Sequence, residues 1–196
     1  MVKYKNRHLL PKEITVVLHN TAVSRAQQPL QRDPVNNHHR KKWNFPSELN
    51  GSYVGYNEFC EPTGETTQER YFGEETIAQI GNNCDTYARC AMYSFCMAGY
   101  FKVEKPTQMQ VDKLISRIRY FESEGFVVRL QQHKDVAPNR TCAEMNDAEI
   151  QAWIEKPQKE TKDQKIARLE AENEKLRNLV TRLIKFSTQL IKLIKK

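Results

Sequence analysis

A run of five β-favouring residues at positions 14–18 (Ile-Thr-Val-Val-Leu) constrains the fold of this chain most. The run is short, and most of it is apolar, so it is typical of a strand buried within a sheet. A polar His-Asn-Thr segment follows at positions 19–21. We therefore expect a buried strand that ends at a polar edge.

Strand and helix signals alternate through the next hundred residues. Extended structure is indicated at residues 53–59, 71–72, 91–101 and 126–130. Pro106 and Thr107 open a helix that Gly125 ends, with apolar residues at helical spacing: Met109, Leu114, Ile115, Ile118 and Phe121. Asn146 is placed to cap a short final helix. The pattern predicts an α/β fold in which a mixed central β-sheet is flanked by helices.

The composition changes at Lys156-Pro157, where a charged linker precedes a helical run without glycine or proline. We expect one domain at residues 1–155, a linker at 156–162 and a long amphipathic C-terminal helix at 163–196. The 196 residues, 39% of them hydrophobic, suffice for one domain of ordinary size.

The C-terminal helix carries a heptad pattern, with Ile166, Asn173, Val180, Ser187 and Ile194 at a and Leu169, Leu176, Leu183 and Leu190 at d. Asparagine at an a position favours a parallel two-stranded coiled coil, so a homodimer is expected. The second half has a wider apolar face backed by lysines, which is typical of contact with an anionic membrane. A helix folded back on its own domain is the third interpretation.

The net charge of +7 resides mostly in this helix, because residues 161–196 hold ten Lys and Arg and four Asp and Glu. The main domain is nearly neutral, which argues against nucleic acid as a partner. The sequence shows no secretory signal segment and no apolar run of the roughly 18 residues that span a bilayer. We expect synthesis in the cytoplasm and five reduced cysteines.

Two histidines follow strand-like runs, His19 after residues 14–18 and His133 after residues 127–132, and Cys142 comes nine positions later. Two imidazoles and a thiolate are zinc ligands that leave the fourth tetrahedral position for water, as in catalytic sites. The spacing alone also allows two strand-end histidines and a buried cysteine.

Five segments occur in the order and approximate spacing of one family: residues 16–22 (VVLHNTA), 54–59 (VGYNEF), 81–83 (GNN), 106–110 (PTQMQ) and 133–142 (HKDVAPNRTC). Over nearly all of residues 10–155 the chain resembles the N-acetylmuramoyl-L-alanine amidases related to peptidoglycan recognition proteins. The bacteriophage lysozyme-type amidases are the most similar branch.

The resemblance implies that Zn²⁺ is held by His19, His133 and Cys142, with Tyr56 as a catalytic residue. Arg140 takes the place of a lysine that many relatives carry two residues before the last ligand, although Thr141 or Lys134 are alternatives in this loop. The chain departs from the family at Gln79, where relatives have histidine, and at Ala143-Glu144, where they have Pro-Gly.

The activity implied is that of an endolysin, in which zinc-activated water cleaves the amide between N-acetylmuramic acid and L-alanine in peptidoglycan. Such an enzyme is made in the host cytoplasm and acts on periplasmic peptidoglycan. Relatives that lack the cysteine ligand bind peptidoglycan without cutting it, and some phage amidases regulate a phage RNA polymerase. These remain the alternatives.

Three other features have less specific interpretations. Glu58, two residues after Tyr56, is either a proton shuttle on the same side of the strand or a salt-bridge residue. The pair at positions 38–39 (His-His) is expected on a solvated helix face that leads into a core tryptophan, Trp43, with a metal or phosphate patch as the alternative. We expect small core residues at Cys84, Cys90 and Cys96.

Overall fold

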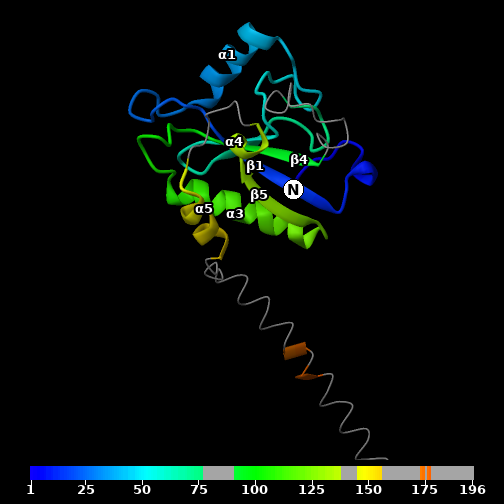
Figure 1. Ribbon diagram of the computed structural model, residues 1–196. Helices are drawn as coiled ribbons and strands as arrows, with labels where there is room; N and C mark the ends of the chain where they lie inside the picture. Colours follow the sequence, from blue (N-terminus) through cyan, green and yellow to red (C-terminus); the bar gives the residue numbers. More distant parts are fainter. Residues whose placement is uncertain (77–90, 138–144, 156–172, 175, 178–196) are drawn as a thin grey trace, which may run out of the picture. The chain divides into compact units, whose positions relative to one another are not determined.

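The computed structural model describes residues 1–76, 91–137, 145–155, 173–174 and 176–177. The chain forms two compact units, Met1–Glu155 and Lys156–Lys196. The strands and helices described below belong to the first unit, and its central sheet is visible in Figure 1.

Five strands form a single mixed sheet in the order β3-β2-β4-β1-β5. Their bounds are β1 Glu13–Asn20, β2 Glu58–Cys60, β3 Thr66–Gln68, β4 Met92–Met97 and β5 Val127–Gln132. The β1 strand pairs in parallel with both β4 and β5, and β2 also pairs in parallel with β4. Among the strands that the structure describes, β2 and β3 form the one antiparallel pair. The predicted mixed central sheet is confirmed, with the run at residues 14–18 inside one of its inner strands.

Helices cover both faces of the sheet. Figure 1 shows α3 (Gln108–Ser123) and α5 (Asp147–Glu155) on one side and α1 (Arg32–Trp43) on the other. A short 3₁₀ helix (Arg7–Leu9) precedes β1, and α4 (His133–Val136) follows β5 directly. The larger core lies beneath α3 and α5, where Leu114, Ile118 and Phe121 pack with Val16 and Leu18.

The ends of α3 and α5 agree with the sequence prediction. Thr107 and Gln110 form a reciprocal capping box at the start of α3. Gly125 follows the last turn of α3 with a φ of 90°. The side chain of Asn146 accepts a hydrogen bond of 2.9 Å from the backbone N–H of Ala148 and so caps α5.

The predicted strand at residues 53–59 is largely wrong, since only Glu58 and Phe59 of that range belong to β2. The preceding backbone is held by side chains instead. Asn36 accepts from the N–H of Tyr53 at 2.7 Å, and His39 accepts from the N–H of Gly55 at 3.0 Å. The predicted strand at residues 71–72 is a single bridge between Phe72 and Tyr4.

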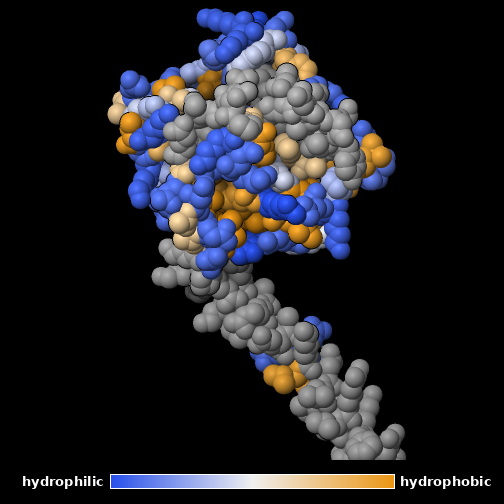
Figure 2. Space-filling model, viewed as in Figure 1, coloured by the Kyte–Doolittle hydropathy of each residue, from blue (hydrophilic) through white to orange (hydrophobic). Residues whose placement is uncertain are grey.

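The β5 strand is the outer strand of the parallel part of the sheet. Figure 2 shows apolar side chains gathered on the face that carries it, and Val127 keeps 51% of its surface exposed. Val128 and Leu130 pack against the core beneath α3, while Val127 and Arg129 are exposed. This alternation is expected for a strand with one buried face.

In the second unit, the described residues Asn173, Glu174, Leu176 and Arg177 are helical and exposed. The other heptad positions lie outside the described residues, as do Cys84 and Cys90, so these predictions stay predictions. Cys96, in contrast, is fully buried. Over the described part of the chain, we find no helix with the length and apolar character needed to cross a membrane.

Glu58 does not act beside Tyr56, because its side chain lies on the α3 side of the sheet. Its carboxylate accepts bonds of 2.6 and 2.8 Å from the Arg117 guanidinium and one of 2.9 Å from the Tyr93 hydroxyl. Glu58 is 1% exposed. The proton-shuttle interpretation is therefore wrong: Glu58 is part of a buried ion pair that fastens α3 to the sheet.

We predict that Arg117→Ala destabilises the protein by about 3–5 kcal/mol, because it leaves the Glu58 carboxylate buried without its cation. Arg119→Ala is the matched control, since Arg119 pairs with Glu122 at the surface, and its loss should cost less than about 1 kcal/mol. Urea unfolding of the two variants measures the difference. Equal losses would contradict the structural role assigned to Glu58.

Candidate active site

The carboxyl ends of β1 and β5 bring two histidines together. Leu18 pairs with Gln132 in the parallel register, so the residues that follow, His19 and His133, lie side by side. Their ring centroids are 4.2 Å apart. Only 1% of His19 and 7% of His133 is exposed. The two imidazoles thus share one buried position at the edge of the sheet.

Tyr56 joins this pair from the segment before β2. Its ring centroid lies 5.0 Å from that of His19, and the residue packs on a second, smaller core that includes Val54, Phe59 and Cys96. Three residues selected from the sequence therefore converge in space: His19, Tyr56 and His133.

His39 of α1 extends this cluster on the side of Tyr56. Its ring centroid lies 5.6 Å from Tyr56 and 4.7 Å from Trp43. Its Nδ1 accepts a bond of 3.0 Å from the N–H of Gly55, the residue before Tyr56. The expected solvated helix face is confirmed for His38, which is exposed. It is wrong for His39, which is 6% exposed, and the expected core tryptophan, Trp43, is 40% exposed.

The sequence contained one signal for His39. Val35 and His39 are four residues apart, which places them on one face of a helix, and Val35 packs on the smaller core. The histidine must then face the sheet as well, next to the Gly-Tyr segment.

Burial controls the charge of these histidines. It lowers the pKa of His19 well below its ordinary value, and the neighbouring His133 lowers it further. For His39, burial lowers the pKa to about 4, with smaller contributions from the charges of His38, Arg70 and Lys42. Both rings are neutral at pH 7. Because the Nδ1 of His39 accepts a bond, its proton is on Nε2.

Two adjacent imidazoles at a polar strand end are a suitable donor pair for a zinc ion. The third ligand expected from the sequence, Cys142, lies outside the described residues, and so do Arg140, Thr141 and Gln79. Lys134, the other alternative in that loop, has its Nζ 3.6 Å from the carboxylate of Asp147. Within the described residues alone, no group of three or more His, Cys, Asp or Glu side chains is arranged to hold a metal.

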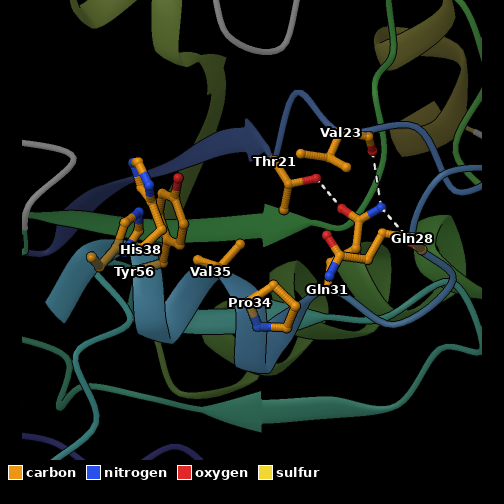
Figure 3. A pocket seen from close by; sticks show the side chains of 9 residues that line it. Thr21, Val23, Gln28, Gln31, Pro34, Val35, His38 and Tyr56 are labelled. Carbon is orange, nitrogen blue, oxygen red and sulfur yellow. Dashed lines mark hydrogen bonds between the residues drawn. The ribbon is translucent and has the colours of Figure 1, made fainter. Parts of the chain in front are cut away.

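A cavity of about 380 Å³ opens beside Tyr56 and His39, between α1 and the segment that connects β1 to α1. Figure 3 shows its apolar wall at Val23, Pro34 and Val35 and the side chain of Gln31 at one end. The Gln31 amide donates to the carbonyls of Val23 and Gln28 at 2.9 and 2.8 Å and also accepts from the Thr21 hydroxyl. These bonds fix the shape of the cavity wall.

Two carboxylates bind the backbone of the segment that connects β1 to α1. Glu104 accepts bonds of 3.1 Å from both the N–H and the guanidinium of Arg25. Glu61 accepts from the backbone N–H groups of Gln31 and Arg32, at 3.0 and 2.8 Å, and so caps the start of α1. The cavity is therefore bounded by backbone that is anchored at both ends.

No family model matches the chain, and no curated protein matches it either. Solved structures do match. The chain has the fold of the peptidoglycan recognition proteins and the N-acetylmuramoyl-L-alanine amidases. This confirms the fold predicted from the sequence resemblance.

Three of the matching structures show the kinds of protein that share this fold. The Drosophila peptidoglycan recognition protein SD is 17% identical, with 81% of this chain and 89% of that chain covered and a TM-score of 0.56. The amidase LysC from Clostridium intestinale is 18% identical, with 78% and 95% covered and a TM-score of 0.52. The endolysin of the Thermus scotoductus bacteriophage Ph2119 is 16% identical, with 78% and 90% covered and a TM-score of 0.51.

In this amidase fold, we predict that His39 makes stability depend on pH between about 6.5 and about 4. In this pH range the unfolded state binds a proton at His39, whereas the folded state does not. The contribution of His39 to the free energy of unfolding is therefore constant above pH 6.5 and falls as the pH drops towards 4. One such group contributes at most about 1.4 kcal/mol per pH unit.

The measurement compares urea unfolding of the wild type with that of His39→Gln, whose side-chain oxygen still accepts from Gly55. The stability of the wild type relative to the variant should decrease from pH 6.5 to pH 4. A difference that does not vary with pH would contradict the burial of a neutral His39.

Proposed function

We propose that this protein is a zinc-dependent amidase that hydrolyses the bond between N-acetylmuramic acid and L-alanine in peptidoglycan. The observation that carries the proposal is the pair of buried histidines, His19 and His133, with Tyr56 against His19. The pair occurs in a fold that solved amidases and an endolysin share. The chemistry of the donors supports the proposal independently of that similarity.

His19 and His133 are the residues that would hold the zinc, together with Cys142 as the third ligand that the sequence resemblance implies. A zinc ion with three protein ligands acidifies a bound water towards a pKa of about 7 and polarises a carbonyl oxygen. Burial of His19 favours this role, because it lowers the pKa of this imidazole and so keeps a neutral ring available as a ligand at pH 7.

Tyr56 has the role of a hydrogen-bond donor to the oxygen that becomes negative when the amide carbonyl is attacked. The position of its ring against His19 supports this role, because His19 is a proposed ligand of the zinc. His39 orients the Gly55-Tyr56 backbone through its bond to Gly55. Arg140 is proposed as the second group that stabilises the oxyanion.

The cavity beside Tyr56 has the composition of a site for an uncharged part of the substrate. Its wall is apolar at Val23, Pro34 and Val35, while Thr21 and Gln28 add hydrogen-bonding groups. Sugars and short peptides need this combination of apolar surface and a few fixed polar groups.

A peptidoglycan-binding protein that does not cut is the second candidate. It is favoured by the similarity to the Drosophila protein, which is named for peptidoglycan recognition. Cys142 favours the enzyme, since the non-catalytic relatives implied by the sequence resemblance lack this ligand.

The C-terminal helix adds proposals that are separate from the chemistry. We propose self-association through residues 163–196 on the basis of Asn173 and the d-position leucines, with contact to an anionic membrane as the alternative. A phage RNA polymerase is a further partner that the resemblance implies, and the site of action is periplasmic peptidoglycan.

We predict that His19→Ala, His133→Ala and Cys142→Ala each remove zinc and murein hydrolysis together, because each deletes one of three ligands. His8→Ala is the matched control, since His8 is an exposed histidine in the 3₁₀ helix that precedes β1. Zinc content and release of amino groups from purified murein are measured on the same preparations. Full activity of a metal-free protein would refute the assignment.

We predict that Tyr56→Phe and Arg140→Ala keep zinc but lower turnover by about 10²- to 10³-fold, the usual effect of removing one oxyanion donor. The zinc content separates these variants from the ligand variants. Wild-type turnover by Arg140→Ala would show that Arg140 does not stabilise the oxyanion. Lys134→Ala would then be the next variant to measure.

A further inference from the structure

Gln132 is the last residue of β5 and lies directly before His133, yet its side chain faces the opposite side of the sheet. It pairs in register with Leu18, whose side chain belongs to the core beneath α3 and α5. Gln132 is 1% exposed. A buried amide is tolerated only where its polar atoms are hydrogen-bonded, so its partners indicate what it holds.

The partners use the whole bonding capacity of the amide. The side chain accepts from the backbone N–H of Asp135 and from that of Met145, the latter at 2.8 Å. Its nitrogen donates to the carbonyl of Met145 at 3.0 Å and to the carboxylate of Asp147. A side-chain amide offers two acceptor positions and two donors, and here all four are engaged.

These bonds join three parts of the chain: the end of β5, the first turn of α4 and the start of α5. The backbone N–H of Gln132 adds a bond of 2.9 Å to the carboxylate of Asp135, which completes a capping box at the start of α4. Met145 follows Cys142 by three positions. The amide therefore connects the residue before one proposed ligand, His133, to Met145, which lies close in the sequence to the other, Cys142.

The first residue of α4 is His133, and α4 contains only four residues. A helix of this length is not stable by itself, so its direction is set by what holds its ends. The bonds of Gln132 to Asp135 and Met145 are such restraints. The 4.2 Å approach of the His133 ring to His19 depends on the direction of this turn.

We propose that Gln132 is a positioning residue for the metal site: its buried amide fixes the first turn of α4 and thereby directs the His133 imidazole towards His19. The inference rests on the proposed function, because it assumes that the two histidines bind zinc. None of the four hydrogen bonds of the Gln132 side-chain amide goes to an imidazole. Residues that orient ligands in this indirect way typically contribute 10- to 100-fold to metal affinity.

The test measures the zinc affinity of the full-length protein by competition with a chromophoric chelator. Gln132→Ala should bind zinc about 10- to 100-fold more weakly than the wild type, with all proposed ligands intact. Absorption of the cobalt(II)-substituted protein gives a second readout, because the d–d bands report the geometry of the ligands.

Gln110→Ala is the matched control. Gln110 is equally buried, and its amide donates to the carbonyls of Cys60 and Ala98 at 3.2 and 2.9 Å. This variant loses a comparable buried amide and should unfold at lower urea concentration, yet keep the zinc affinity and the cobalt spectrum of the wild type. If Gln110→Ala weakened zinc binding as much as Gln132→Ala, general destabilisation would explain both, and the proposal would be wrong.

Gln132→Met decides the matter if Gln132→Ala does not fold. The methionine side chain has a similar length and can fill the same buried space, but it makes none of the four amide bonds, so zinc affinity should still fall. Unchanged affinity in a folded Gln132 variant would overturn this inference and leave the proposed function intact. A wild-type protein that binds no zinc would overturn both.

Discussion

The site depends on the in-register parallel pairing of β1 with β5. This register places Leu18 opposite Gln132 and so makes His19 and His133 neighbours at the same sheet edge. A slip of one residue would turn one histidine to the other face, because side chains alternate along a strand. The register is held from the far side of the sheet, where Ile14, Val16 and Leu18 pack beneath α3. Apolar packing on one face thus fixes the geometry of the polar groups on the other.

The same burial determines the chemistry of the histidines. An imidazolium is costly to remove from water, so enclosure keeps His19 and His39 neutral across the physiological range. Neutral rings retain a lone pair, which His39 uses to accept from Gly55 and which His19 can offer to a metal. Folding at low pH is opposed for the same reason. Burial of neutral histidines therefore lowers the stability of the folded state in acid.

The sequence predicted the features that follow from local periodicity. The buried run at residues 14–18, the capped start of α3 at Thr107 and the strand-end positions of His19 and His133 are of this kind. The sequence-based predictions were wrong where side chains from distant parts of the chain, and not strand pairing, hold the backbone. Glu58 was assigned to the side of Tyr56 by strand alternation, but β2 begins only at Glu58, so Tyr56 lies in no strand from which to count. The ion pair with Arg117 joins residues 59 positions apart, which no local pattern reveals.

Strand ends explain why the supports of the site are side chains. Beyond the last ladder bond, backbone N–H and C=O groups need other partners, and here they find them in polar side chains. Asn36 and His39 hold the backbone before Tyr56, Gln31 and Glu61 hold the segment after β1, and Gln132 holds the turn at His133. Each of these bonds is specific in direction, unlike apolar contact. The precision of the site therefore resides in a few buried amides, carboxylates and one imidazole, whereas the apolar core supplies the stability that keeps them in place.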